Sequence, residues 1–188
     1  MSPEALGVVT LPLVSVENGV ATFIAMPAQL EDRNKRREGC VLRGLPLRPV
    51  LGQGLVGGKV EQGQTIIQAM VTEWDQETTD ALGRPVRILD MDSRLKAMFE
   101  DIPIIQERPE LTQFSVTLFL LQLAAEETRD MEQHGGHRVM LDMMTGATNS
   151  VQDGSIIEMR PAHADLLYLW ASVAQSMKIQ PAEVEINA

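Results

Sequence analysis

One arrangement of side chains in this sequence could bind a metal ion. Asp130 and His134 are four residues apart, so on a helix they share one face, and His137 follows across two glycines. Carboxylate and imidazole are ligands for Zn²⁺, Fe²⁺ and Mn²⁺. However, the two glycines would end the helix, and neither H-E-x-x-H nor E-x-x-H occurs. The favoured interpretation is a helix C-terminus with histidine at the negative end of the helix dipole, and the metal site is the alternative.

A second pair of carboxylates, Asp90 and Asp92, follows a strand that we predict at residues 86–89. Two carboxylates with this spacing could share Mg²⁺ with a phosphate group. The arrangement resembles the first motif of haloacid-dehalogenase-like phosphatases, which follows the first strand of that fold. Arg94 stands where that family carries Thr or Val, and Asp92 and Ser93 are good helix caps. We therefore interpret these residues as the cap of a short helix.

Residues 52–57 match the dinucleotide-binding pattern G-x-G-x-x-G. The pattern indicates phosphate binding only when it ends a strand and opens a helix, whose N-terminal amides meet the phosphates. Gly58 and Gly63 oppose an immediate helix, and Pro46 and Pro49 oppose a preceding strand. The sequence therefore predicts a flexible or bulged β segment here.

Six basic residues gather in a window of the chain that contains a single acidic residue, Glu38, and no aromatic residue. The window at residues 33–48 carries a net charge of +5, which leaves -15 for the other residues of a chain whose total is -10. The acidic remainder and the absence of aromatic side chains argue against nucleic acid. A solvated loop and a contact with an acidic surface, including another copy of the chain, both remain open. The basic cluster consists of Arg33, Lys35, Arg36, Arg37, Arg43 and Arg48.

The composition limits the class of protein. A chain of 188 residues with 44% hydrophobic residues can bury a core in one domain or two small ones. One cysteine excludes an intramolecular disulfide framework. No secretory signal is visible, and no apolar run approaches the ~18 residues needed to cross a membrane, so we expect a cytoplasmic protein.

The first half of the chain predicts mostly strands. Residues 8–16 and 20–26 predict a β-hairpin, because Asn18-Gly19 suits a type I′ turn. Residues 40–60 predict an extended, turn-rich stretch. Residues 64–82 fit either a helix or strands, and we favour strands because the stretch is rich in β-branched residues.

The second half predicts mostly helices. A short helix follows Asp92, and a long helix runs from Pro109 to about His134, with its apolar first half buried. Strands at 138–144 and 155–160 are joined by a ten-residue loop. A final helix begins at Pro161 and ends near Lys178, before a tail.

We therefore expect one compact α+β domain, with a β-rich N-terminal half of antiparallel strands and a helical C-terminal half packed on it. Its parts are a β-rich part at 1–90, a helical part with one hairpin at 91–178, and a tail at 179–188. The expected function is a non-enzymatic assembly or interaction subunit, such as a bacterial or phage structural or assembly protein. It would form a homo-oligomer or bind an acidic protein surface through the basic cluster, without a cofactor and without a membrane. The alternative is a small metal-dependent enzyme that uses Asp130, His134 and His137.

Overall fold

The computed structural model of the chain describes residues 5–27, 53–103 and 114–186. The strands of this part are β1 (Ala5–Glu17), β2 (Val20–Pro27), β3 (Gln53–Gly54), β4 (Val56–Lys59), β5 (Lys96–Pro103), β6 (Phe114–Gln122), β7 (His137–Asp142) and β8 (Thr148–Ser150). Its helices are α2 (Ile66–Thr78), α3 (Met91–Arg94), α4 (Ala125–Gln133) and α5 (Pro161–Ile186). The fold is thus α+β, as expected. The expected division into a strand half and a helix half is wrong, because helices and strands occur in both halves.

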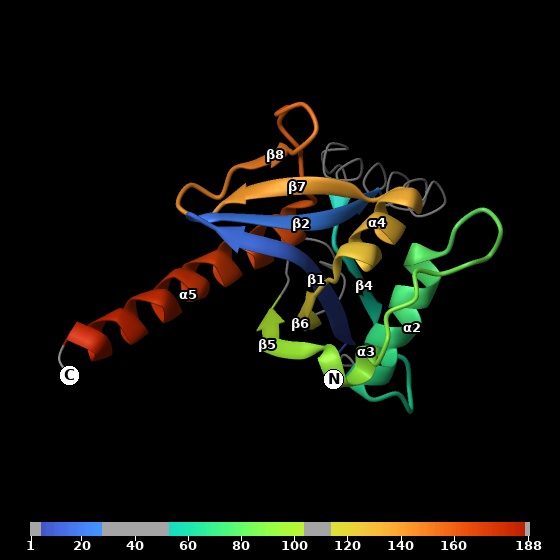
Figure 1. The fold of residues 1–188 in the computed structure, drawn as a ribbon. Coiled ribbons are helices and arrows are strands. Elements are labelled where there is room, and N and C mark those ends of the chain that lie inside the picture. The colour runs from blue at the N-terminus through green and yellow to red at the C-terminus, as the bar shows by residue number, and fades with distance from the viewer. Residues whose placement is uncertain (1–4, 28–52, 104–113, 187–188) are drawn as a thin grey trace, which may run out of the picture.

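One mixed sheet of eight strands forms the centre of the fold (Figure 1). Its order is β5-β6-β1-β2-β7-β8, with β4 also paired to β1 and β3 also paired to β2. Within the described residues, no helix is both long and apolar enough to cross a membrane.

The predicted N-terminal hairpin is confirmed. β1 pairs antiparallel with β2, and Glu17 lies opposite Val20 across a two-residue turn. Asn18 and Gly19 both have positive φ, at 51° and 75°, as a type I′ turn requires.

The long helix predicted from Pro109 is wrong over its apolar half. Residues 114–122 form β6, which pairs in parallel with β1 from Ala5 opposite Phe114 to Leu13 opposite Gln122. β5 pairs with its other edge, so β6 lies inside the sheet. A strand buried on both faces carries apolar side chains on both of them, which explains why most of this run lacks a regular alternation of apolar and polar residues. The polar half of the prediction survives as α4, which ends at His134 before Gly135 with φ 95°.

The predicted strands at 64–82 are also wrong, because most of this stretch forms α2. Thr65 and Gln68 make a capping box at its start: Gln68 N donates to Thr65 Oγ1 at 3.1 Å, and Thr65 N donates to Gln68 Oε1 at 2.9 Å. Met70 and Trp74 are fully buried on the inner face of the helix. Burial of this face and satisfied N-terminal amides together outweigh the β-propensity of the segment.

Three smaller differences concern boundaries. The helix predicted after Asp92 is wrong beyond Arg94: it covers only Met91–Arg94, and the residues from Lys96 to Pro103 form β5. Asp90, rather than Asp92 or Ser93, occupies its N-cap position, without a side-chain capping bond. The partner of β7 is Thr148–Ser150 rather than residues 155–160. The last helix begins at Pro161 as predicted and continues to Ile186, through most of the predicted tail.

Two apolar cores lie on opposite faces of the sheet, because successive side chains of a strand point to opposite faces. Val8 of β1 belongs to the core beneath α2 and α4, which also contains Trp74 and Met131. Val9 belongs to the other core, which contains Trp170 of α5. The sheet is therefore a middle layer between α2 and α4 on one face and α5 on the other, and the end of α5 projects beyond the sheet (Figure 1).

Candidate functional site

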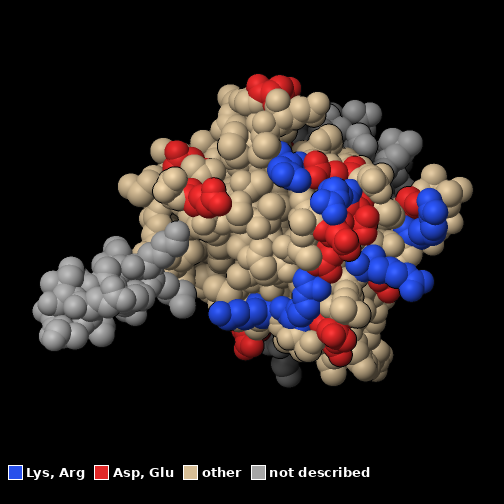
Figure 2. All heavy atoms as spheres, in the orientation of Figure 1, with Lys and Arg blue, Asp and Glu red and all other residues tan. Residues whose placement is uncertain are grey.

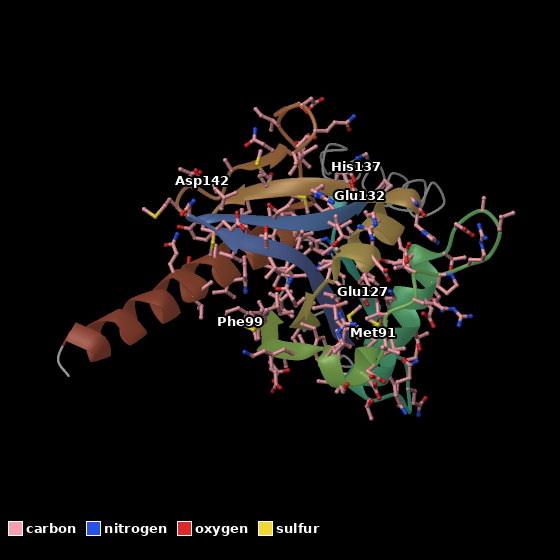
Figure 3. All side chains as sticks on the ribbon, viewed as in Figure 1. Met91, Phe99, Glu127, Glu132, His137 and Asp142 are labelled. Carbon is pink, nitrogen blue, oxygen red and sulfur yellow. The ribbon has the colours of Figure 1, made fainter. Side chains whose placement is uncertain are left out.

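The residues of the predicted metal site lie near the end of α4. His134 Nδ1 is 2.6 Å from the carbonyl oxygen of Asp130, and its Nε2 is 3.1 Å from the carbonyl oxygen of Arg84. Asp80 Oδ2 is 3.6 Å from the same Nε2. His137 is exposed where β7 begins (Figure 3). His134 thus joins α4 to the turn after α2, and a metal site at these residues stays a prediction.

The six residues of the basic cluster lie outside the described part of the chain. Binding of an acidic surface through them stays a prediction. Over the described residues, no group of three or more His, Cys, Asp or Glu side chains is arranged to hold a metal ion.

A different pair of carboxylates meets the glycine-rich strand β4. Glu73 and Glu77 are one turn apart on α2, so they share one face of the helix. Gly57 N donates to Glu77 Oε2 at 3.1 Å. The carboxyl group of Glu73 lies over Gly58 so closely that a Cβ atom at Gly58 would overlap it. Both glutamates are half-buried, which limits their access to water.

The elements around this pair hold it in place. β4 pairs with β1, so that Val8 lies opposite Gly58 and Val9 lies opposite Gly57. α2 packs on the same face of the sheet through Trp74, whose indole Nε1 donates to Val86 O at 2.9 Å. The pairing of β4 with β1 and the packing of α2 through Trp74 therefore fix how far the two carboxylates lie from the two glycines.

Oxygen ligands at such a site suit a hard divalent cation. Mg²⁺ is usually bound by one or two carboxylates, with water and substrate phosphates as its further ligands. Glu73 and Glu77 provide two carboxylates, which fits this mode of binding. Among the described residues, no third acidic or histidine side chain joins this pair as a ligand.

Glu73 and Glu77 were not among the predicted site residues, because strands were favoured for this stretch. Two signals could have found them. Thr65 and Gln68 have the spacing of a capping box, and glutamates four residues apart lie on one face only if the segment is a helix.

A second group of charged residues stabilises the fold nearby. Arg94 donates to both carboxylate oxygens of Glu127, at 2.9 and 2.7 Å, and also to the carbonyl oxygens of Leu89 and Gln122. The hydrogen bond from Arg94 lowers the pKa of Glu127, against burial, which raises it, and with help from the Ala124 N–H. Glu127 in turn raises the pKa of Arg94. This ion pair joins α3 to α4 and β6.

Basic and acidic side chains are intermingled over the part of the surface around α3 and α4 (Figure 2). The ion pairs there include Arg94 with Glu127, and Arg138 with Glu132 at 2.6 Å. Figure 3 shows Glu127 on the same side of the fold as Met91 of α3. Charged side chains in this region therefore form ion pairs with one another.

Comparison with known proteins shows a similar fold among solved structures. No protein-family model matches the sequence, and neither does any curated protein. Among solved structures, the chain is similar to a mutT/nudix family protein from Listeria innocua, with a TM-score of 0.52 and 11% sequence identity. That match covers 95% of this chain and 99% of the other.

A MutT/nudix family protein from Enterococcus faecalis also matches, with a TM-score of 0.46 and 12% identity over 89% of this chain. This chain spans only 61% of the length of that protein. At 11% identity, the likeness to the Listeria innocua protein concerns the fold. The expectation of a non-enzymatic assembly or structural protein is therefore corrected, because the chain shares its fold with a mutT/nudix family protein.

Proposed function

We propose that this chain is a hydrolase whose reaction takes place where α2 meets β4. The shared fold supports the proposal, because proteins of the mutT/nudix family are hydrolases. The observation that carries it is the hydrogen bond of 3.1 Å from Gly57 N to Glu77 Oε2. It holds a carboxylate of α2 against a strand that has no side chains at two successive positions.

The proposed substrates are phosphate anhydrides or phosphate esters. A divalent cation, when bound, polarises a phosphoryl oxygen and lowers the pKa of a bound water. Glu73 and Glu77 would hold this cation through their carboxylate oxygens. Gly57 orients Glu77, and the bare backbone of Gly58 leaves space for the carboxyl group of Glu73. Both interactions are in place in the protein alone, so the ligands need little reorganisation on binding.

The reaction is the displacement of an oxygen leaving group from phosphorus by water. The new bond joins the water oxygen to phosphorus, and the bond from phosphorus to the leaving oxygen breaks. The attacking water loses one proton and the leaving oxygen gains one. The acidic side chains of α2 would repel the negatively charged phosphate in the absence of a cation. We therefore expect hydrolysis to depend on a divalent cation.

The test is release of phosphate or pyrophosphate from nucleoside di- and triphosphates and from inorganic pyrophosphate, with Mg²⁺ or Mn²⁺ and with a chelator. Glu77→Gln and Glu73→Gln should each lower kcat/KM by ~100-fold or more, since each removes a charged ligand of the cation. Glu126→Gln is the matched control, because Glu126 is an exposed glutamate in the first turn of α4.

Two results would contradict the proposal. One is the absence of hydrolysis of every phosphate compound in the presence of either cation. The other is hydrolysis that survives both substitutions on α2, which would place the reaction elsewhere. A loss of activity in the Glu126→Gln control would point to a general effect of surface charge instead.

A further inference from the structure

The strand that carries the two site glycines changes its partner at Leu55. Before this residue, β3 pairs with β2, with Gly54 opposite Met26. After it, β4 pairs with β1, with Val56 opposite Thr10. Leu55 lies between the two strands, and it is only 2% exposed. Its backbone N–H therefore needs a partner from outside the sheet, because a buried and unpaired amide is costly.

His163 provides that partner. Leu55 N donates to His163 Nδ1 at 2.9 Å, and His163 is 5% exposed near the start of α5. Because an amide can only donate, Nδ1 carries a lone pair and the ring proton is on Nε2. Gly54 allows the approach, since a Cβ atom there would lie 3.1 Å from this Nδ1.

The start of α5 is bound to β3 by backbone hydrogen bonds as well. Arg160 N donates to Gln53 O at 2.8 Å, and Gln53 N donates to Glu158 O at 2.9 Å. These bonds fix the imidazole of His163 relative to the strand. The imidazole ring thus holds the backbone N–H of Leu55 in place, at a position where no hydrogen bond between strands does so.

Leu55 and Gly57 are two residues apart in an extended segment, which is roughly 7 Å. The segment joins the two helical layers: Leu55 belongs to the core beneath α5, and Val56 belongs to the core beneath α2. The amide of Gly57 reaches Glu77 on the α2 side. A change at His163 can therefore move the Gly57 amide through only two residues of chain.

We propose that His163 is a positioning residue for the site at α2 and β4, and this rests on the proposed function. Its imidazole acts from the opposite face of the sheet, through Leu55, on the amide that orients Glu77. It does not contact the substrate. Its effect is on the placement of a carboxylate ligand, so loss of His163 lowers kcat more than it changes KM.

The experiment compares two substitutions of the same residue. In His163→Asn, Oδ1 stands where Nδ1 stood and can accept the Leu55 N–H, whereas His163→Leu has no acceptor. We expect kcat of His163→Leu to fall by about 10- to 100-fold, in keeping with the cost of small misplacements of reacting groups. His163→Asn should recover most of this loss. Leu167→Ala is the control, because Leu167 is a buried residue of the same helix, and it should keep its kcat although it loses stability.

A second measurement does not depend on activity. In ¹H–¹⁵N NMR spectra, the amide signal of Gly57 should move in His163→Leu and in Glu77→Gln, and stay near its wild-type position in His163→Asn and Leu167→Ala. If His163→Leu does not fold, Gly54→Ala replaces it, because its new methyl group displaces the ring by a few tenths of an ångström.

The outcomes separate the two proposals. A wild-type protein without hydrolase activity, but with the expected movement of the Gly57 signal, would refute the proposed function and leave the coupling through Leu55 supported. An unmoved Gly57 signal in folded His163→Leu or Gly54→Ala would overturn the positioning role. Equal losses of kcat in His163→Leu and Leu167→Ala would overturn it too, because they would reflect stability alone.

Discussion

Substitution by alanine should lower the stability of the protein at Gly57 and leave it nearly unchanged at the adjacent Gly58. In Gly57→Ala the new methyl group would overlap the carbonyl oxygen of Val8 and lie 2.9 Å from Val9 Cγ2 and 3.0 Å from Val9 Cα. These atoms belong to β1, which is paired to β6 along its length, so they cannot withdraw. In Gly58→Ala the three atoms nearest to the new methyl group all belong to the carboxyl end of the Glu73 side chain.

The expected changes in stability depend on which atoms the new methyl group must displace. Overpacking against backbone costs typically about 1–3 kcal/mol, and we expect Gly57→Ala at the upper end. At about 2–3 kcal/mol, this corresponds to a Tm lower by roughly 4–12 °C for a chain of this size. For Gly58→Ala, the lower entropy of the unfolded chain stabilises by about 0.4–1 kcal/mol and offsets the displacement of Glu73. Its stability should therefore stay within about 1 kcal/mol of wild type.

In Gly58→Ala, hydrolytic activity should fall although stability is nearly unchanged. If Glu73 holds a cation as proposed, its displacement should lower kcat/KM about 100-fold while the Tm hardly changes. The assays are urea and thermal unfolding followed by circular dichroism, together with phosphate release. Equal destabilisation by the two substitutions would refute the packing argument. Full activity in Gly58→Ala would refute the role assigned to Glu73.

Three further predictions concern stability. Gly19→Val should destabilise the hairpin by at least about 1–2 kcal/mol in urea unfolding, because a β-branched residue resists the φ of 75° at this position. Leu118→Ala should cost about 2–5 kcal/mol in the same assay, since Leu118 is 1% exposed inside β6, and a cost below about 0.5 kcal/mol would place it at the surface. Glu127 has a lowered pKa in the folded protein, so its contribution to stability is present above its ordinary pKa near 4.5 and is lost as the pH falls below it. Unfolding free energies between roughly pH 6 and pH 3 should therefore fall less steeply in Glu127→Gln than in wild type, and parallel curves would contradict this assignment.

Several local features of the fold could be predicted from the sequence. The turn at Asn18-Gly19 and the helix that begins at Pro161 are set by the backbone preferences of the residues themselves. The end of α4 follows in the same way from Gly135. In each case the deciding residues are neighbours in the chain, so no distant contact is required.

The spacing of Thr65 with Gln68 and of Glu73 with Glu77 could have indicated a helix, but it does not say what that helix packs against. Glu73 and Glu77 are ordinary glutamates in the sequence, and they acquire a role only where α2 lies against β4. That contact depends on the pairing of β4 with β1, about 50 residues earlier in the chain. Sequence spacing instead drew attention to Asp130 and His134, but the His134 ring contacts the backbone oxygens of Asp130 and Arg84 and the carboxylate of Asp80.

The sequence by itself determined the turn at Asn18-Gly19, the start of the helix at Pro161, the end of α4, the α+β class and the presence of apolar segments long enough to form a core. Only the tertiary structure decided that residues 114–122 are a strand, because a largely apolar run suits a buried helix and a buried strand equally well. The open edge of β1 resolved that choice, since its unpaired amides and carbonyls need a neighbouring strand. Tertiary structure likewise decided that two glutamates meet two glycines, because side chains distant in sequence become neighbours only when the sheet pairs and the helices pack on it.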